Sequence, residues 1–461
     1  MKADANQTPK LPVAGGAAVS RNNFYVYRIA IAAAVSGFLF GFDTAIINGA
    51  LIFLRQEFHL TELQTEFAAG SLLIGCLFGA GGAGTLSDRF GRKRILLAAA
   101  TLFGLSSIGT ALPHNLHQFA IARLIAGMAI GVASVLAPMY IAEISPPEIR
   151  GRLVSLNQMA IVTGVVSAFC VNWTLSSIGD SSWRLMFAAA AVPSLAFLVA
   201  LLFVPESPRW LSRAGYTDKA MSVLRKVSGA HAEAEAREIQ RSLAEESGTL
   251  REILAPHLRR PLFIAISLAI LSQVTGINTV TYYGAILFKD HAGHGNATSA
   301  LGANLIVGVV NFLCTIVAIA VIDRVGRKVL LLIGSAGMAV SLSLLGVALW
   351  ASPPPSNLIL IAILFYVGFF AVSLGPVTWV YIAELFPTAI RGRAISAATL
   401  SLWTACLLVS LTFLSLMKLI SPGGAFWLYA TLCLVTFIFV WRWVPETKGR
   451  SLEEIQRMWK G

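Results

Sequence analysis

One long motif occurs twice in this 461-residue chain. Residues 140–152 read YIAEISPPEIRGR, and residues 381–393 read YIAELFPTAIRGR, about 240 positions further along. The segment DRFGRK at 88–93 likewise returns as DRVGRK at 323–328. Every copy lies between long apolar segments, so the repeat indicates a membrane-embedded half that was duplicated. Two such halves predict a transporter whose site lies between them.

The composition makes the bilayer the solvent for most of the chain. Hydrophobic residues form 56% of the sequence and charged residues only 13%, about half the charged fraction of a soluble domain. A helix needs about 20 mostly apolar residues to cross the hydrocarbon core. We therefore expect an all-α membrane protein, with about twelve transmembrane helices in two pseudo-symmetric six-helix halves. The predicted spans begin near residues 27, 66, 94, 118, 153, 184, 262, 300, 328, 357, 393 and 425.

These spans divide the chain into five parts. We predict a disordered cytoplasmic tail at 1–25, an N-terminal half at 26–208, a cytoplasmic linker at 209–260, a C-terminal half at 261–445 and a cytoplasmic tail at 446–461. Helical spacing within 217–227 and 232–244 predicts short helices in the linker. The linker is too short for a nucleotide-binding domain, and the sequence has no P-loop motif. ATP-driven transport is therefore not expected.

Lys and Arg gather in alternate connections between the spans, around residues 89–94, 150–152, 324–328 and 391–393. Short loops rich in Lys and Arg face the cytoplasm, so we expect a multi-pass protein of the cell membrane with both termini inside. The net charge of +12 then reflects this bias. Because the basic residues are spread over separate loops without an aromatic stripe, no nucleic-acid partner is expected.

Ionisable residues inside the spans are few. The five cysteines lie in apolar spans without the clustering that a metal site needs, and none of the seven histidines falls at the middle of a span. We expect neither a metal nor an organic cofactor. An ionisable residue deep in a span costs about 2.5 to 3.5 kcal/mol to insert and usually marks a pathway or relay. Asp43 in the first span and Arg123 in the fourth are the candidates.

Asp43 and Arg123 are predicted partners, because each charge offsets part of the desolvation of the other. One interpretation is a static structural pair. The alternative is that Asp43 takes a proton from outside, releases Arg123 and so couples protonation to a rearrangement of the halves. The residues alone leave both interpretations open.

The motifs resemble those of the sugar porter branch of the major facilitator superfamily, over the whole chain apart from the N-terminal tail. GTLSDRFGRK at 84–93 is similar to the general loop motif of that superfamily. PESPRWL at 205–211, RGR at 150–152 and QVTGIN at 273–278 are narrower matches. The resemblance is to bacterial proton-coupled pentose and hexose symporters, which carry an Asp where this chain has Asp43. It implies a proton as the coupling ion and Arg123 as the partner of Asp43.

Sugar recognition needs hydrogen-bond donors and acceptors for hydroxyls and aromatic faces for C–H surfaces. The resemblance implies a substrate site built from amides, aromatic residues and a glycine expected to break the tenth span, namely Phe40, Gln158, Gln273, Asn278, Tyr282, Asn311, Gly375, Trp379 and Trp403. Without the resemblance, each isolated amide is equally consistent with a hydrogen bond between helices, and the glycine with tight packing.

The chain departs from the family pattern at three places. Many sugar porters have a Gln-Gln pair where this chain has Ser272-Gln273, and related symporters often have a polar residue at Leu402, before Trp403. Each neutral hydrogen bond that is not made weakens binding by about 1 kcal/mol, so the sugar is not identified. In the second loop motif Ile319 replaces Gly84, from which we expect a close helix approach to be lost there.

Charged residues at the span ends resemble the family's salt-bridge network, which closes the inside face when the cavity opens outward. Determination of topology by Lys and Arg is the alternative, although Glu143 and Glu384 contribute nothing to it. The predicted cytoplasmic gate comprises Asp88, Arg89, Arg92, Glu143, Arg150, Glu206, Arg209, Asp323, Arg327, Glu384, Arg391 and Glu446.

The sequence therefore predicts a proton-coupled monosaccharide symporter that imports a pentose, hexose or polyol by alternating access. We expect it to function as a monomer and not to be an enzyme, because the substrate leaves unchanged. A facilitative sugar uniporter is the nearest alternative. A non-transporting sugar sensor fits less well, because such proteins usually add long cytoplasmic extensions, and the amides and Trp residues fit a sugar better than the apolar cation of a multidrug exporter.

Overall fold

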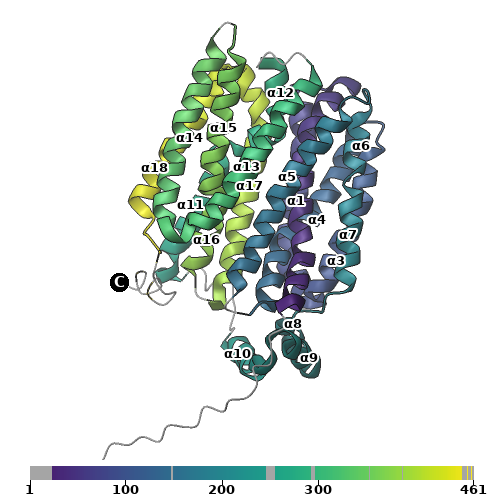
Figure 1. Cartoon of the computed structure of the whole chain (residues 1–461), viewed down its shortest axis with the longest axis vertical. Coiled ribbons are helices and arrows are strands. Elements are labelled where there is room, and N and C mark those ends of the chain that lie inside the picture. The colour runs from purple at the N-terminus through teal and green to yellow at the C-terminus, as the bar shows by residue number, and fades with distance from the viewer. Residues whose placement is uncertain are drawn as a thin grey trace, which may run out of the picture.

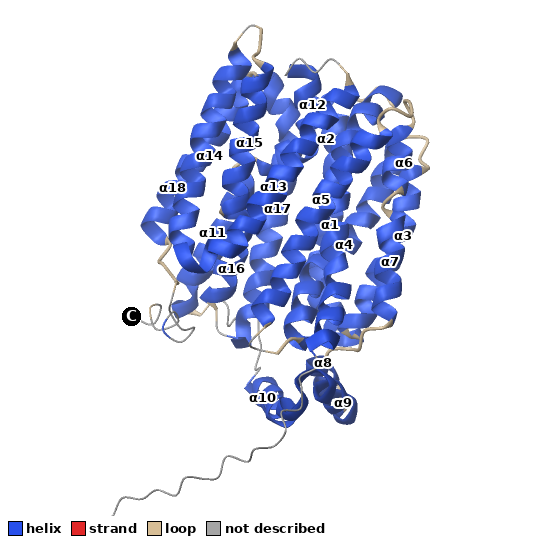
Figure 2. Cartoon of the chain, viewed as in Figure 1, coloured by secondary structure: helices blue, strands red, loops and turns tan. Residues whose placement is uncertain are grey.

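The structure, a computed structural model, describes residues 23–146, 149–245, 255–291, 296–351, 353–386, 388–448, 454 and 458. These residues form helices and connecting loops, without a strand among them (Figure 2). The first helix begins at Asn23, so most of the tail predicted as disordered lies outside the described residues.

The helices follow one another in two similar series. The N-terminal half contains α1 (Asn23–Glu57), α2 (Glu62–Phe90), α3 (Arg92–Ala111), α4 (Leu116–Ile144), α5 (Arg150–Leu175), α6 (Ser182–Ala188) and α7 (Ala191–Leu202). The linker contains α8 (Pro208–Arg213), α9 (Thr217–Ser228) and α10 (Ala232–Glu245), with 3-10 turns at Gly229–His231 and Pro256–Leu258. The C-terminal half contains α11 (Arg259–Val274), α12 (Ile277–His291), α13 (Ala297–Val325), α14 (Arg327–Trp350), α15 (Ser356–Val372), α16 (Leu374–Leu385), α17 (Thr388–Ile420) and α18 (Pro422–Trp443).

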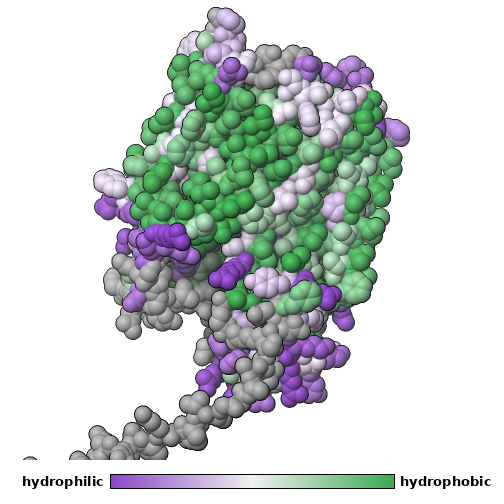
Figure 3. Space-filling model, viewed as in Figure 1, coloured by the Kyte–Doolittle hydropathy of each residue, from purple (hydrophilic) through white to green (hydrophobic). Residues whose placement is uncertain are grey.

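Within the described residues, 12 segments are long and apolar enough to cross a membrane, which confirms the predicted number. Each predicted start lies within about one helical turn of the observed one. Three of the spans consist of two consecutive helices, which are α6 with α7, α11 with α12, and α15 with α16. Apolar side chains cover the flank of the bundle, and hydrophilic ones gather at its ends and on the linker helices (Figure 3).

The two halves lie side by side, and α8, α9 and α10 lie together at one end of the bundle (Figure 1). We call this the linker end and the opposite one the outer end. Between the halves, α2 packs on α17 and α13 packs on α5. Each contact joins the second span of one half (α2 or α13) to the fifth span of the other (α17 or α5). This is expected when duplicated halves are related by a pseudo-twofold axis. A third contact, between α1 and α12, also joins the halves.

Of the three divided spans, the two in the C-terminal half are broken beside predicted site residues. The break between α11 and α12 lies at Thr275 and Gly276, where φ of Gly276 is 93°, a left-handed conformation that glycine adopts without steric cost. The break between α15 and α16 lies at Ser373, not at Gly375 as the sequence predicted. Pro376 lies in the first turn of α16, where a missing N–H is tolerated, so the helix begins before Gly375.

Glycine allows α2 and α4 to approach until their backbones touch. A Cβ atom on Gly127 of α4 would lie 1.9 Å from the carbonyl oxygen of Leu72 in α2, which is far inside van der Waals contact. Gly84 is different, because a Cβ atom there would have nothing within 4 Å. The expectation that Ile319 removes a close approach present at Gly84 is therefore wrong, since Gly84 makes none.

Gly127→Ala is expected to lower the free energy of unfolding by about 1 to 3 kcal/mol, because the new methyl group forces α2 and α4 apart. Thermal unfolding in detergent measures the change. Gly84→Ala in α2 serves as the control and is expected not to destabilise the protein, since alanine fits there and favours a helix by up to about 1 kcal/mol. Equal melting temperatures for the two variants would contradict backbone contact between α2 and α4.

Candidate functional site

A buried ion pair joins α1 to α4 in the N-terminal half. Asp43 and Arg123 are both almost wholly buried, with side-chain exposures of 3% and 0%. The Nη1 atom of Arg123 donates to both carboxylate oxygens of Asp43, at 2.8 and 2.7 Å, and Nη2 donates to the Asp43 carbonyl oxygen at 3.4 Å. The guanidinium group also lies 5.1 Å from the ring centroid of Phe187. The structure thus brings together the two side chains that the sequence predicted to be partners.

Asp43 and Arg123 balance only each other's charge within the described residues. Among the described salt bridges, Asp43 and Arg123 each have one partner, which is the other residue. The Nε atom of Arg123 is buried without a hydrogen-bond partner. A change at either residue therefore leaves an uncompensated charge in a low-dielectric interior, which is costly. This geometry is compatible with a static pair and with a proton-coupled one.

The predicted substrate residues begin one helical turn from Asp43. The rings of Phe40 in α1 and Trp403 in α17 contact each other across the boundary between the halves, with centroids 5.4 Å apart and planes tilted by 60°. Trp403 is 3% exposed, and its indole N–H is buried without a hydrogen-bond partner. The Tyr282 hydroxyl lies 3.8 Å from Sγ of Cys406, one turn beyond Trp403. The helix that carries the ion pair thus also contributes an aromatic wall.

Two of the predicted amides already bind each other across the break in their span. Asn278 of α12 donates from Nδ2 to Oε1 of Gln273 in α11 at 2.6 Å. Gln273 in turn donates from Nε2 to the Ser272 hydroxyl at 2.9 Å. The serine that replaces the first Gln of the family's pair therefore acts as a hydrogen-bond acceptor for the second.

The remaining predicted substrate residues are not joined to these clusters. Gln158 of α5, Asn311 of α13 and Trp379 of α16 are partly exposed, and their side chains take part in no described hydrogen bond. Gly375 lies in the first turn of α16, where a Cβ atom would approach the ring of Phe370 to 3.3 Å. Gln158, Asn311 and Trp379 thus keep their hydrogen-bonding capacity for another molecule.

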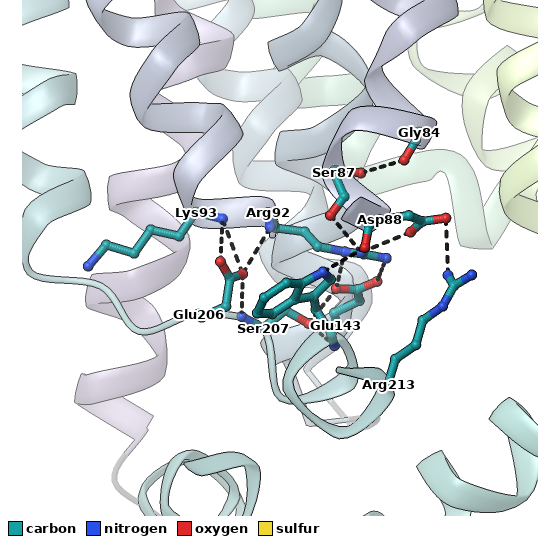
Figure 4. A network of polar contacts seen from close by, with 10 residues as sticks. Gly84, Ser87, Asp88, Arg92, Lys93, Glu143, Glu206, Ser207 and Arg213 are labelled. Carbon is teal, nitrogen blue, oxygen red and sulfur yellow. Dashed lines mark hydrogen bonds and ion pairs between the residues drawn. The ribbon is translucent and has the colours of Figure 1, made fainter. Parts of the chain in front are cut away.

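A polar network holds the linker end of the N-terminal half together (Figure 4). Arg92 at the start of α3 pairs with Glu143 of α4 at 3.1 Å and with Asp88 of α2 at 2.9 Å. The carboxylate of Glu206, which follows α7, accepts the backbone N–H groups of Arg92 and Lys93 at 3.0 and 3.1 Å. Glu206 therefore caps the N-terminus of α3, where a negative charge is favourable.

The C-terminal half repeats this network with the duplicated residues. Arg327 at the start of α14 pairs with Glu384 of α16 and with Asp323 of α13, both at 2.8 Å. Glu446 accepts the backbone N–H groups of Arg327 and Lys328, each at 3.0 Å. The repeat in the sequence is thus a repeat of contacts. Arg213 of the linker helix α8 also pairs with Asp88, at 3.0 Å (Figure 4). None of the ion pairs described in these two networks joins one half to the other.

Three predicted gate residues make described contacts outside these networks. Arg89 is exposed, with its guanidinium group 5.2 Å from the ring centroid of Phe90. Arg150 is exposed and donates to the Ser145 carbonyl oxygen at 3.3 Å through Nε. Arg209 donates to the Ser242 hydroxyl in α10 at 3.1 Å. The side chain of Arg391 lies outside the described part of the structure.

Polar contacts between the halves gather at the outer end. Asn48 of α1 donates to the carbonyl oxygens of Val280 and Thr281 at 3.1 and 2.7 Å and accepts the N–H of Ala285 at 2.9 Å, all in α12. Glu66 of α2 binds Ser415 of α17. Two longer ion pairs follow, Arg55 with Asp290 and Lys418 with Glu62, both at 3.7 Å.

Sequence reasoning missed Asn48 and Glu66. Asn48 is uncharged and belongs to no repeated motif, so the sequence does not distinguish it from other polar residues. Glu66 coincides with the predicted start of its span and therefore reads as a solvated helix end, yet it is only 1% exposed. The capping box of Thr61 and Gln64 starts α2 at Glu62. This sequence pattern places Glu66 one turn inside the helix and not at its end.

Comparison with known proteins places the chain in a family. Residues 29–459 match the family described as sugar (and other) transporter. The chain belongs to this sugar transporter family. It is therefore a multi-pass membrane protein of a transporter family, and its fold is that of the major facilitator superfamily.

Relatives in the sugar transporter family align along almost the whole chain. The arabinose-proton symporter of Bacillus subtilis (strain 168) is 39% identical over 98% of each chain. The D-xylose-proton symporter of Escherichia coli (strain K12) is also 39% identical, over 95% of this chain and 96% of its own length. A solved structure of the superfamily's proton:xylose symporter, bound to 6-bromo-6-deoxy-D-glucose, superposes with a TM-score of 0.82 at 38% identity. That superposition covers 95% of this chain and 100% of the solved one.

Arg123→Leu is expected to lower the free energy of unfolding by about 3 to 5 kcal/mol, because it leaves the Asp43 carboxylate buried without a partner. The double variant Asp43→Leu with Arg123→Leu is expected to recover most of that loss, since two apolar side chains replace the pair. Thermal unfolding in detergent measures both changes. Additive losses in the double variant would show that the two side chains do not depend on each other.

Proposed function

We propose that the protein is a proton-coupled monosaccharide symporter that imports a pentose, hexose or polyol by alternating access. The observation that carries this proposal is the buried Asp43–Arg123 pair, which lies one turn from the Phe40–Trp403 contact in the same helix α1. A membrane-embedded ionisable pair marks a relay by default. The relatives named as arabinose-proton and D-xylose-proton symporters support the same coupling ion and substrate class.

Protonation of Asp43 supplies the coupling step. A neutral carboxyl no longer balances the charge of Arg123, whose guanidinium group is wholly buried, so the state with an intact pair loses stability relative to one in which Arg123 finds water or another acceptor. Because Asp43 and Phe40 belong to the same helix, a shift of α1 that follows release of Arg123 also moves an aromatic wall of the sugar site. A proton and a sugar then favour the same conformational change.

The sugar is held by side chains that offer both donors and acceptors. The side-chain amides of Gln158 and Asn311 and the indole N–H of Trp403 have no hydrogen-bond partner within the described residues, so binding of hydroxyls satisfies them without breaking an internal bond. Gln273 and Asn278 bind each other and exchange this bond for contacts with the sugar. Trp379 and Tyr282 complete the aromatic surface. The choice among glucose, xylose, galactose, arabinose and inositol depends on this set of groups.

We place the linker end in the cytoplasm, because the loops rich in Lys and Arg lie there, and the protein in the cell membrane. The outer end then faces outward, and its contacts between α1, α2, α12 and α17 hold it shut in this conformation. The networks around Arg92 and Arg327 act as two halves of a cytoplasmic gate that meet when the outer end opens. One chain contains both halves, so it functions as a monomer, without enzymatic chemistry and without a cofactor other than the proton.

Asp43→Asn is expected to abolish sugar accumulation that is driven by a proton gradient while leaving downhill exchange intact, because Asn cannot take up the coupling proton. Uptake of labelled sugars into proteoliposomes, with an imposed gradient and a panel of pentoses, hexoses and polyols, measures this. The unmodified chain is expected to accumulate one of these sugars. Equal and gradient-independent uptake by both proteins would make the protein a uniporter with a structural Asp43, and binding without any uptake would make it a sensor.

Gln158→Ala is expected to raise the sugar KM about fivefold to tenfold, as a lost neutral hydrogen bond predicts, and to leave the melting temperature unchanged because Gln158 has no described internal partner. Uptake kinetics and thermal unfolding of the same preparation separate the two effects. Ser155→Ala, a partly exposed position in the same helix whose hydroxyl donates only to the Gly151 carbonyl oxygen, is the control. A fall in stability with an unchanged KM would assign Gln158 to helix packing.

A further inference from the structure

Glu66 is a buried carboxylate whose two described hydrogen bonds both cross from one half to the other. It lies one turn into α2 and is 1% exposed. Its Oε1 atom accepts the backbone N–H of Ser415 in α17 at 2.7 Å, and its Oε2 atom accepts the Ser415 hydroxyl at 2.7 Å. The described salt bridges give it no cation. The basic residues nearby, Arg55 and Lys418, pair with Glu62 and Asp290 instead.

This arrangement makes the buried charge dependent on the opposite half. Burying a carboxylate without a cation is costly unless hydrogen bonds replace its hydration. Hydrogen bonds to an ionised acceptor are about twice as strong as neutral ones, and Ser415 supplies two of them. The neighbouring Tyr283 donates to the Ser410 carbonyl oxygen at 2.6 Å. Side chains of α2 and α12 thus both bind the same stretch of α17.

We propose that Glu66 and Ser415 form an outer latch, in which Glu66 is a positioning residue that sets how often the outer end opens. The inference rests on the proposed alternating access. Entry of a sugar from the outer side requires α2 and α17 to separate, and this breaks both hydrogen bonds to the Glu66 carboxylate. The strength of the latch therefore determines the ratio of outward-open to outward-closed protein, without contact with sugar or proton carrier.

A second pair between the same two helices shows why burial matters. Glu62 and Lys418 also join α2 to α17, but their side chains are 36% and 74% exposed and their charged atoms are 3.7 Å apart. Exposed pairs of this kind contribute little, because water screens them and replaces them readily. Glu66 lies one turn deeper, where water does not replace Ser415 while the end is closed. The latch is therefore the buried contact, not the ion pair above it.

Spin labels report the opening directly. Gln56 in α1 and Leu419 in α17 are exposed residues near the outer end of opposite halves, and each is replaced by cysteine in a chain whose Cys170 and Cys314 are changed to serine. Pulsed electron–electron distance measurements on the full chain in lipid nanodiscs, without sugar, give the populations of short and long distances. Because neither uptake nor a proton gradient is needed, failure of the proposed symport and failure of the latch are separate results.

Ser415→Ala is expected to raise the ratio of long to short distances about tenfold, as loss of one hydrogen bond to a charged acceptor predicts. The same change in a Glu66→Gln background is expected to raise it less than about threefold, because a neutral acceptor binds the hydroxyl more weakly. Thr412→Val is the matched control, since Thr412 is exposed on the same helix and bonds only to carbonyl oxygens of α17. An unchanged ratio in Ser415→Ala, or an equal rise in both backgrounds, would overturn the latch.

Discussion

The bilayer supplies no hydrogen bonds, so every backbone group that leaves a regular helix within a span needs a partner from the protein itself. This requirement explains many of the buried polar side chains. Four wholly buried tyrosines each donate a hydroxyl to a backbone carbonyl oxygen, which are Tyr140 to Pro205, Tyr366 to Thr275, Tyr283 to Ser410 and Tyr381 to Pro445. One acceptor, Thr275, lies at the break between α11 and α12, so Tyr366 of α15 supplies a partner that the broken helix lacks there. The others lie after a helix end or within α17.

The duplicated sequence predicts much of the architecture because it repeats the residues that fix helix ends. Arg92 and Arg327 each receive an acidic residue from their own half, and Glu206 and Glu446 each cap the helix that begins there. Hydrophobic length alone places the spans, since a bilayer has a fixed thickness. The partnership of Asp43 and Arg123 was also predictable, because few charges lie within the spans and opposite charges there stabilise each other. Its role in coupling stays a prediction.

Some features could not be predicted from the sequence, because they depend on contacts between residues that are far apart in the chain. Gly375 and Pro376 look like a break, yet the helix restarts at Leu374 because Ser373 adopts the irregular conformation. Arg89 belongs to a repeated motif, yet it faces away from the network. Glu66 resembles an ordinary helix end in sequence, and only the packing of α2 on α17 buries it. The exact position of a helix break, the partners of a surface arginine and the contacts between the two halves thus became known only from the structure.

The hydrogen bond between Asn278 and Gln273 has a consequence for which molecules the site accepts. In the proposed sugar site, this mutual bond uses one N–H of Asn278 and the side-chain oxygen of Gln273, so a ligand that displaces it has to replace both partners. It must replace a donor and an acceptor at once, within the spacing of the two carboxamides. Two adjacent hydroxyls on a ring meet that demand from two positions, whereas a single hydroxyl has to reach both carboxamides from one oxygen atom. In the proposed sugar site, displacement of this mutual bond therefore favours ligands with adjacent hydroxyls over ligands with a single one.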